Sequence, residues 1–191
     1  MSTHVAALVG SLREESHTRW ASRIALAAAE ERGATTDLVD LRELDLPVFD
    51  GDAREAGDAA ELAERIADAD SVLLATPVYH GSYSSVLKNA LDYCGFDEFD
   101  ETTVGLLAVA GGGFPSPALD HLRIVGRSLN AWVLPHQAAL PNVYRHFEDG
   151  ELVDEDLRDR VAKLGVRLVE YAHIEPEPRT VEARENVGAD D

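Results

Sequence analysis

Five short apolar segments alternate with segments of helical periodicity, and this alternation limits the fold more than any other feature of the sequence. As a group the apolar segments are hydrophobic at consecutive positions rather than at every second one, which favours strands buried on both sides. Such strands are typical of parallel sheets that helices cover on both faces. The predicted strands are residues 4–9, 35–41, 71–76, 103–110 and 131–134.

The segments between these strands place apolar residues three to four positions apart, as amphipathic helices do. Leu62 and Ile66 are one such pair. Five strand–helix units in 191 residues predict an α/β fold, a flavodoxin-like doubly wound three-layer sandwich with a five-stranded parallel sheet. We assign residues 1–174 to this domain and expect residues 175–191, which contain prolines and several acidic residues, to form an acidic mobile tail.

The charge of the chain limits its partners. Seventeen basic residues against 36 acidic ones leave a formal net charge of -19, and only Lys88 and Lys163 are lysines. This charge disfavours binding to nucleic acid or to an anionic membrane, because neither phosphate surface could be neutralised. Salt screens the repulsion between the acidic groups, so we expect a halophilic protein adapted to a salt-rich cytoplasm. An ordinary acidic protein from a low-salt host is the alternative.

Several other classes of protein are disfavoured. A basic head followed by an apolar stretch is absent at the start of the chain, and no apolar run is long enough for a membrane span, so we expect a cytoplasmic protein. The single cysteine, Cys94, follows an apolar helical face and is predicted to be a core thiol. The seven histidines lack the spacings of a zinc site, so no metal site is expected.

The loop after the first predicted strand has the composition of an anion site. It reads GSLREESHT (residues 10–18) and offers hydroxyls, the Arg13 guanidinium and the unpaired amides of a helix start. It lacks the fingerprints of dinucleotide and ATP sites, so a monophosphate fits it better than a pyrophosphate. The alternative is that Ser16 simply caps the helix. Glu14 and Glu15 count against an anion site unless they point to solvent.

Two further loops are expected at the same edge of the sheet, because they also follow strands. Residues 77–85 (PVYHGSYSS) combine a proline turn with aromatic side chains that could grip a flat heterocycle. The alternative is local packing of the tyrosines, with Ser84 or Ser85 capping the next helix. Three glycines, residues 111–113, would let the backbone approach a ligand closely, or would form a flexible connector.

The motifs GSLREES and PVYHGSYSSVLKNALDY resemble those of the NADPH-dependent FMN reductase family, flavodoxin-like proteins that include quinone, azo-dye and chromate reductases. The resemblance covers residues 4–170 in order and spacing. It implies that Ser11, Arg13, Ser16 and Thr18 hold the phosphate of FMN. It also implies that the second loop borders the isoalloxazine ring and that the glycines support the other side of the ring. These residues are Pro77, Val78, Tyr79, His80, Gly81, Ser82, Gly111, Gly112 and Gly113.

Three positions depart from the usual motif of this family. Thr18 and His80 stand where asparagine is usual, and Val78 stands where glutamate is usual. The Thr18 hydroxyl can still donate to a phosphate. His80 could donate a proton or hydrogen bond to the flavin or to a quinone oxygen, but we favour a purely structural role in place of asparagine.

The resemblance implies an enzyme, an NAD(P)H-dependent FMN reductase or quinone reductase, with FMN as cofactor and NADPH or NADH as electron donor. Hydride would pass from the nicotinamide to bound FMN and then to a flavin, quinone or similar small-molecule acceptor. No catalytic side chain is expected, because the flavin carries the chemistry. The alternatives are a flavodoxin-like electron carrier without direct NAD(P)H oxidation and a protein that has lost its flavin. A homodimer or homotetramer is also implied.

Overall fold

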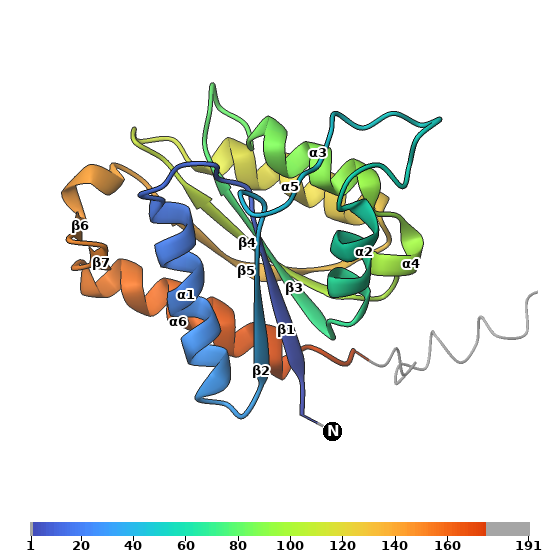
Figure 1. Ribbon diagram of the computed structural model, residues 1–191. Coiled ribbons are helices and arrows are strands. Elements are labelled where there is room, and N and C mark those ends of the chain that lie inside the picture. The colour runs from blue at the N-terminus through green and yellow to red at the C-terminus, as the bar shows by residue number, and fades with distance from the viewer. Residues whose placement is uncertain (1, 175–191) are drawn as a thin grey trace, which may run out of the picture.

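A parallel five-stranded sheet forms the centre of the protein (Figure 1). The computed structural model describes residues 2–174, and the predicted tail at 175–191 lies outside these residues. The strands lie in the order β2-β1-β3-β4-β5, and each neighbouring pair is parallel. Their bounds are β1 (His4–Val9), β2 (Thr35–Asp40), β3 (Ser71–Pro77), β4 (Thr103–Val109) and β5 (Trp132–Leu140). The predicted flavodoxin-like doubly wound fold is therefore confirmed.

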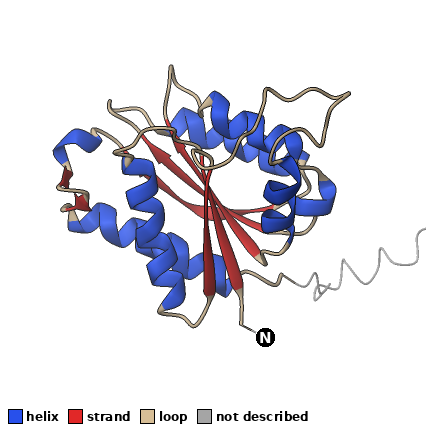
Figure 2. Cartoon of the chain, in the orientation of Figure 1, coloured by secondary structure: helices blue, strands red, loops and turns tan. Residues whose placement is uncertain are grey.

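Helices cover both faces of the sheet (Figure 2). One face packs against α1 (His17–Glu30) and α6 (Glu155–Glu170), and the other against α2 (Ala59–Ala67), α3 (Ser85–Tyr93) and α5 (Ser116–Ser128). Because side chains alternate across a strand, each central strand contributes to both apolar layers: Leu8 faces one and Val9 the other. This two-sided burial is the reason for the continuous apolar runs in the sequence.

The fifth strand is longer than its sequence suggests, and the prediction that it ends at Leu134 is wrong. β5 continues to Leu140 through Pro135, which has no amide proton for a sheet hydrogen bond. The proline is tolerated because β5 lies at the edge of the sheet and is irregular there: residues 134–136 lie opposite the single residue Gly105 of β4.

Arg123 of α5 satisfies backbone groups at this irregularity. Its guanidinium donates to the carbonyl oxygen of Leu134 at 3.1 Å and to Gln137 Oε1 at 2.8 Å. An arginine on this helix would be expected on a solvated face, but Arg123 is partly buried and bound to the neighbouring strand. Only its place beside β5 gives it this role.

Three short elements have no counterpart in the predicted pattern. They are the short helix α4 (Phe96–Phe99), a 3-10 turn at Val143–Arg145, and a hairpin of β6 (Phe147–Glu148) and β7 (Glu151–Leu152). The turn and hairpin follow the carboxyl end of β5, so they lie beside the loops that follow β1, β3 and β4. Within residues 2–174 the helices are too short or too polar to cross a lipid bilayer.

Candidate functional site

The loops after β1, β3, β4 and β5 meet in one pocket at the carboxyl edge of the sheet. Strands that are adjacent and parallel bring these loops together although the loops are far apart in the chain. The lining consists of Ser11, Arg13, Ser16, His17, Thr18, Pro77, Val78, Tyr79, Val109, Gly111, Val143 and Tyr144. Eight of the thirteen residues predicted for the site thus line the pocket; the other five are described below.

The first loop presents its hydroxyls to the pocket. Ser16 is the N-cap of α1, and its Oγ accepts a hydrogen bond of 3.2 Å from the Arg19 amide. Capping uses only an acceptor position of the Ser16 hydroxyl, so the hydroxyl proton stays free to donate to a ligand. Ser16 can therefore cap the helix and bind an anion at the same time. Ser11 and Thr18 are only 3% and 2% exposed, yet both line the pocket.

The second loop is a tight turn whose tip lies outside the pocket lining. Tyr79 and Ser82 exchange two backbone hydrogen bonds of 3.0 and 3.1 Å. Between them, His80 and Gly81 both adopt positive φ angles, 50° and 79°. Two consecutive positive φ angles are typical of a two-residue turn that favours Asn-Gly. Pro77, Val78 and Tyr79 line the pocket, whereas His80, Gly81 and Ser82 do not.

Ser84 connects the second loop to the first. Its hydroxyl donates to the carbonyl oxygen of Gly10 at 2.7 Å and accepts a hydrogen bond of 3.1 Å from the Leu87 amide, which makes Ser84 the N-cap of α3. Gly10 leaves no room for a side chain, because a Cβ there would lie 2.6 Å from Leu87 Cβ. Sequence reasoning identified Ser84 as a possible cap but missed its bond to the other loop.

The glycine loop contributes through one residue. Gly111 lines the pocket, and a Cβ at this position would lie 2.9 Å from Cε2 of Tyr144. Gly112 and Gly113 are exposed with open space around them, and neither lines the pocket. The close approach of this ring to the backbone favours glycine at position 111.

Tyr144 is a site residue that the sequence did not reveal. Its hydroxyl accepts a hydrogen bond of 3.3 Å from Arg13, and its ring lies edge-on to His17 with 5.5 Å between the centroids. The residue sits in the turn after β5, and the predicted early end of that strand hid the position. The αL conformation of Asn142, with φ 49°, begins this turn.

The charges around the pocket favour an anion. The polar lining consists of hydroxyls, the Arg13 guanidinium and the His17 ring, and in the described part of the chain no carboxylate contributes to it. Glu14 and Glu15 are exposed. Partial burial, and then the nearby positive charge of Arg13, lower the pKa of His17 below its ordinary value. This donor set fits a phosphate group, and the remaining apolar lining fits a flat ring.

Cys94 does not belong to the site. Its thiol is buried in the core layer that contains α3, and burial raises its pKa to about 12. A thiol with this pKa stays protonated and is a poor nucleophile. The core position predicted for this residue is confirmed.

Residues 3–145 match the sequence profile of the NADPH-dependent FMN reductases. The chain belongs to this family. This FMN reductase family member is 33% identical over 178 residues to an FMN-dependent NADPH-azoreductase of Staphylococcus haemolyticus. The aligned region covers 88% of this chain and 95% of that protein. An azoreductase of the same name from Staphylococcus aureus (strain COL) is 32% identical over equal shares.

Solved structures support the fold of this family member. A flavoenzyme NAD(P)H:(acceptor) oxidoreductase from Paracoccus denitrificans aligns with a TM-score of 0.75 at 23% identity, covering 89% of this chain and 97% of that one. An FMN-dependent NADH-azoreductase from Bacillus anthracis, solved in complex with FMN, aligns with a TM-score of 0.63 at 13% identity over 88% and 100% of the two chains. The predicted family is confirmed.

Proposed function

We propose that this protein is an FMN-dependent NAD(P)H oxidoreductase that reduces small-molecule acceptors. The observation that carries the proposal is the two-part pocket at the carboxyl edge of the sheet. One part offers hydroxyls and a guanidinium, and the other offers apolar walls and a glycine backbone. A phosphate joined to a flat ring matches both parts. Membership of the reductase family favours this function over that of an electron carrier.

Each part of the pocket has its own role in this proposal. Ser11, Arg13, Ser16 and Thr18 would hold the phosphate of FMN. Residues 77–82 would border the isoalloxazine ring, and residues 111–113 would support its other side. Tyr144 would close the phosphate end, because its hydroxyl already accepts a hydrogen bond from Arg13.

FMN bound in this pocket supplies two-electron transfer between a nicotinamide and an acceptor. The protein residues bind, orient and exclude water, and no side chain is assigned a proton transfer. Because the two staphylococcal relatives described above are named NADPH-azoreductases, azo dyes and quinones are the first acceptors to test, with NADPH before NADH.

The setting of the protein is also part of the proposal. We infer a cytoplasmic homodimer or homotetramer adapted to a salt-rich interior, without nucleic-acid or membrane partners. The formal net charge of -19 supports the absence of nucleic-acid partners and of membrane partners. Light scattering over a range of salt concentrations tests the oligomeric state.

Anaerobic visible spectroscopy tests the proposed function. Protein purified in high salt is expected to be yellow and to bleach when NADPH or NADH is added. Arg13→Gln is expected to weaken FMN binding, whereas Arg23→Gln, which removes an exposed arginine outside the pocket, should not. A yellow protein that does not bleach would indicate an electron carrier. A colourless protein that cannot take up FMN would refute the proposal.

A further inference from the structure

We propose that Arg19 and Asp40 form a positioning pair that keeps the carboxylates of Glu14 and Glu15 out of the phosphate site. Neither Arg19 nor Asp40 lines the pocket, and neither belongs to the motif residues considered above. The inference rests on the proposed function, since it concerns how this chain selects the phosphorylated form of a flavin. It makes Arg19 a residue that determines FMN specificity through the loop it holds.

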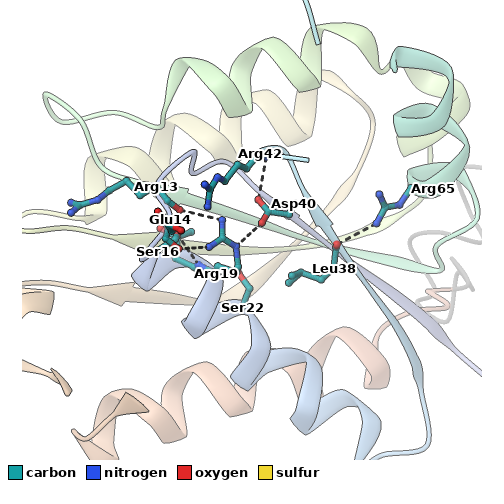
Figure 3. Close-up of polar contacts among 10 residues, drawn as sticks. Arg13, Glu14, Ser16, Arg19, Ser22, Leu38, Asp40, Arg42 and Arg65 are labelled. Atoms are coloured by element: carbon teal, nitrogen blue, oxygen red, sulfur yellow. Dashed lines mark hydrogen bonds and ion pairs between the residues drawn. The ribbon is translucent and has the colours of Figure 1, made fainter. Parts of the chain in front are cut away.

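The pair is buried between the first loop and the end of the neighbouring strand (Figure 3). Arg19 lies in the first turn of α1 and is 7% exposed, and Asp40 is the last residue of β2 and is 4% exposed. Arg19 Nε donates to Asp40 Oδ2 at 2.5 Å. The other carboxylate oxygen of Asp40 accepts a hydrogen bond of 3.2 Å from the Arg42 amide. Both partners are therefore held in one orientation.

The two remaining nitrogens of the guanidinium hold the loop. Nη1 donates to the carbonyl oxygen of Glu14 at 2.9 Å, and Nη2 donates to that of Arg13 at 3.2 Å. Because each peptide unit is planar, fixing two consecutive carbonyls fixes the planes that join residues 13, 14 and 15. These planes set the directions of three side chains: Arg13 lines the pocket, while Glu14 and Glu15 are exposed and do not.

The need for such control follows from the sequence of the loop. Two carboxylates beside a phosphate would repel it, so the same nine residues can bind or reject an anion according to their backbone conformation. A guanidinium suits the task because its donors form a rigid planar fork that can reach one carboxylate and two carbonyls together. An ammonium at the same place would keep the charge but lose this geometry.

Titrations with FMN and with riboflavin, which lacks the phosphate, test the inference on full-length protein freed of flavin by dialysis. In Arg19→Lys, the Kd for FMN should rise about tenfold or more, because several charge-assisted bonds are lost. The Kd for riboflavin should change by less than about threefold, within the effect of one weak contact. Equal weakening of both ligands would indicate a merely structural role and overturn the inference, as would unchanged FMN binding.

A rescue experiment separates the carboxylates from general stiffening of the loop. Adding Glu14→Gln and Glu15→Gln to the Arg19→Lys variant should return the Kd for FMN to within about threefold of the wild-type value. The matched control is Glu31→Gln with Glu64→Gln, which removes the same charge from exposed positions outside the pocket and should rescue nothing. Absence of rescue by the first pair, or equal rescue by both pairs, would overturn the inference.

The test does not depend on the Arg19 variant folding. In the wild-type background, Glu14→Gln with Glu15→Gln should change the Kd for FMN by less than about threefold, because both side chains are exposed and neither lines the pocket. A tenfold tightening would show that they act on the phosphate and would refute the inference. Wild-type protein that binds FMN no more tightly than riboflavin would instead refute the phosphate site, and with it the proposed function.

Discussion

The hydroxyl of Ser84 donates a hydrogen bond of 2.7 Å to the carbonyl oxygen of Gly10, which lies 74 residues earlier in the chain. The same hydroxyl caps α3. One buried side chain therefore joins the end of β1 to the start of α3 and sets the distance between the two loops that would hold the opposite ends of a flavin.

Replacing Ser84 tests this connection. Ser84→Ala removes the cap and the bond between the loops, so the free energy of unfolding should fall by about 1–2 kcal/mol. Urea denaturation measures this change, and Ser85→Ala, at the exposed neighbouring position, is the control. Equal stability of Ser84→Ala and the control would contradict the role of the hydroxyl.

Gly10 provides the second test of the same contact. In Gly10→Ala the new methyl group would meet Leu87 Cβ at 2.6 Å and the Ser84 hydroxyl at 2.8 Å. Relief of this overlap requires a backbone shift, so the expected loss of stability is about 1–3 kcal/mol. Gly112→Ala adds the same methyl group where nothing lies within 4 Å and should be nearly neutral. Thermal denaturation of both variants settles the comparison; similar midpoints would show that the overlap is harmless.

His80 is expected to act through its backbone conformation. Its φ of 50° suits asparagine and glycine but strains a β-branched residue. His80→Asn should keep the stability within about 0.5 kcal/mol, whereas His80→Val should lose about 1 kcal/mol or more. Turnover of His80→Asn should match that of the wild type across pH. Loss of a pH dependence near neutrality in this variant would instead assign the imidazole a chemical role.

The ring of His17 links stability to pH. Burial first and the Arg13 charge second lower its pKa below 6.5, so the fold favours the neutral ring. Between the pKa of His17 in the folded protein and pH 6.5, the unfolded chain therefore binds more protons than the folded protein. The stability that the neutral His17 ring contributes is complete above pH 6.5, and it is lost as the pH falls toward the pKa of the folded protein. Unfolding free energies of wild type and His17→Gln from pH 5 to 8 measure this effect. Parallel pH profiles would contradict it.

The acidic composition predicts a dependence on salt. Because the formal net charge is -19, repulsion within the folded protein should weaken as the Debye length falls from about 10 Å at 0.1 M to about 3 Å at 1 M salt. The melting temperature should therefore rise steadily with sodium chloride. Sodium chloride is used because sulfate is excluded from the protein surface and would raise the stability by that separate effect. A flat profile would favour an ordinary acidic protein over a halophilic one.

The sequence alone was sufficient for most of the sheet and its helices. The predicted bounds of β1 coincide with those of the structure, because its continuous apolar run reports burial on both faces. The convergence of the loops at one edge followed from the general behaviour of parallel sheets. The end of β5 was missed because Pro135 resembles a strand terminator, and only the edge position and the Arg123 contacts make a longer strand possible.

The tertiary structure alone decided how the site is held together. Periodicity and motifs describe neighbours along the chain, so they identified the loop at 10–18 and the hydroxyls it offers. They could not show that the Arg19 side chain would reach Asp40 on β2, or that Tyr144 would lie against Gly111. Such contacts depend on which strands are adjacent and on the register between them, and both are set by packing of the whole sheet rather than by local sequence.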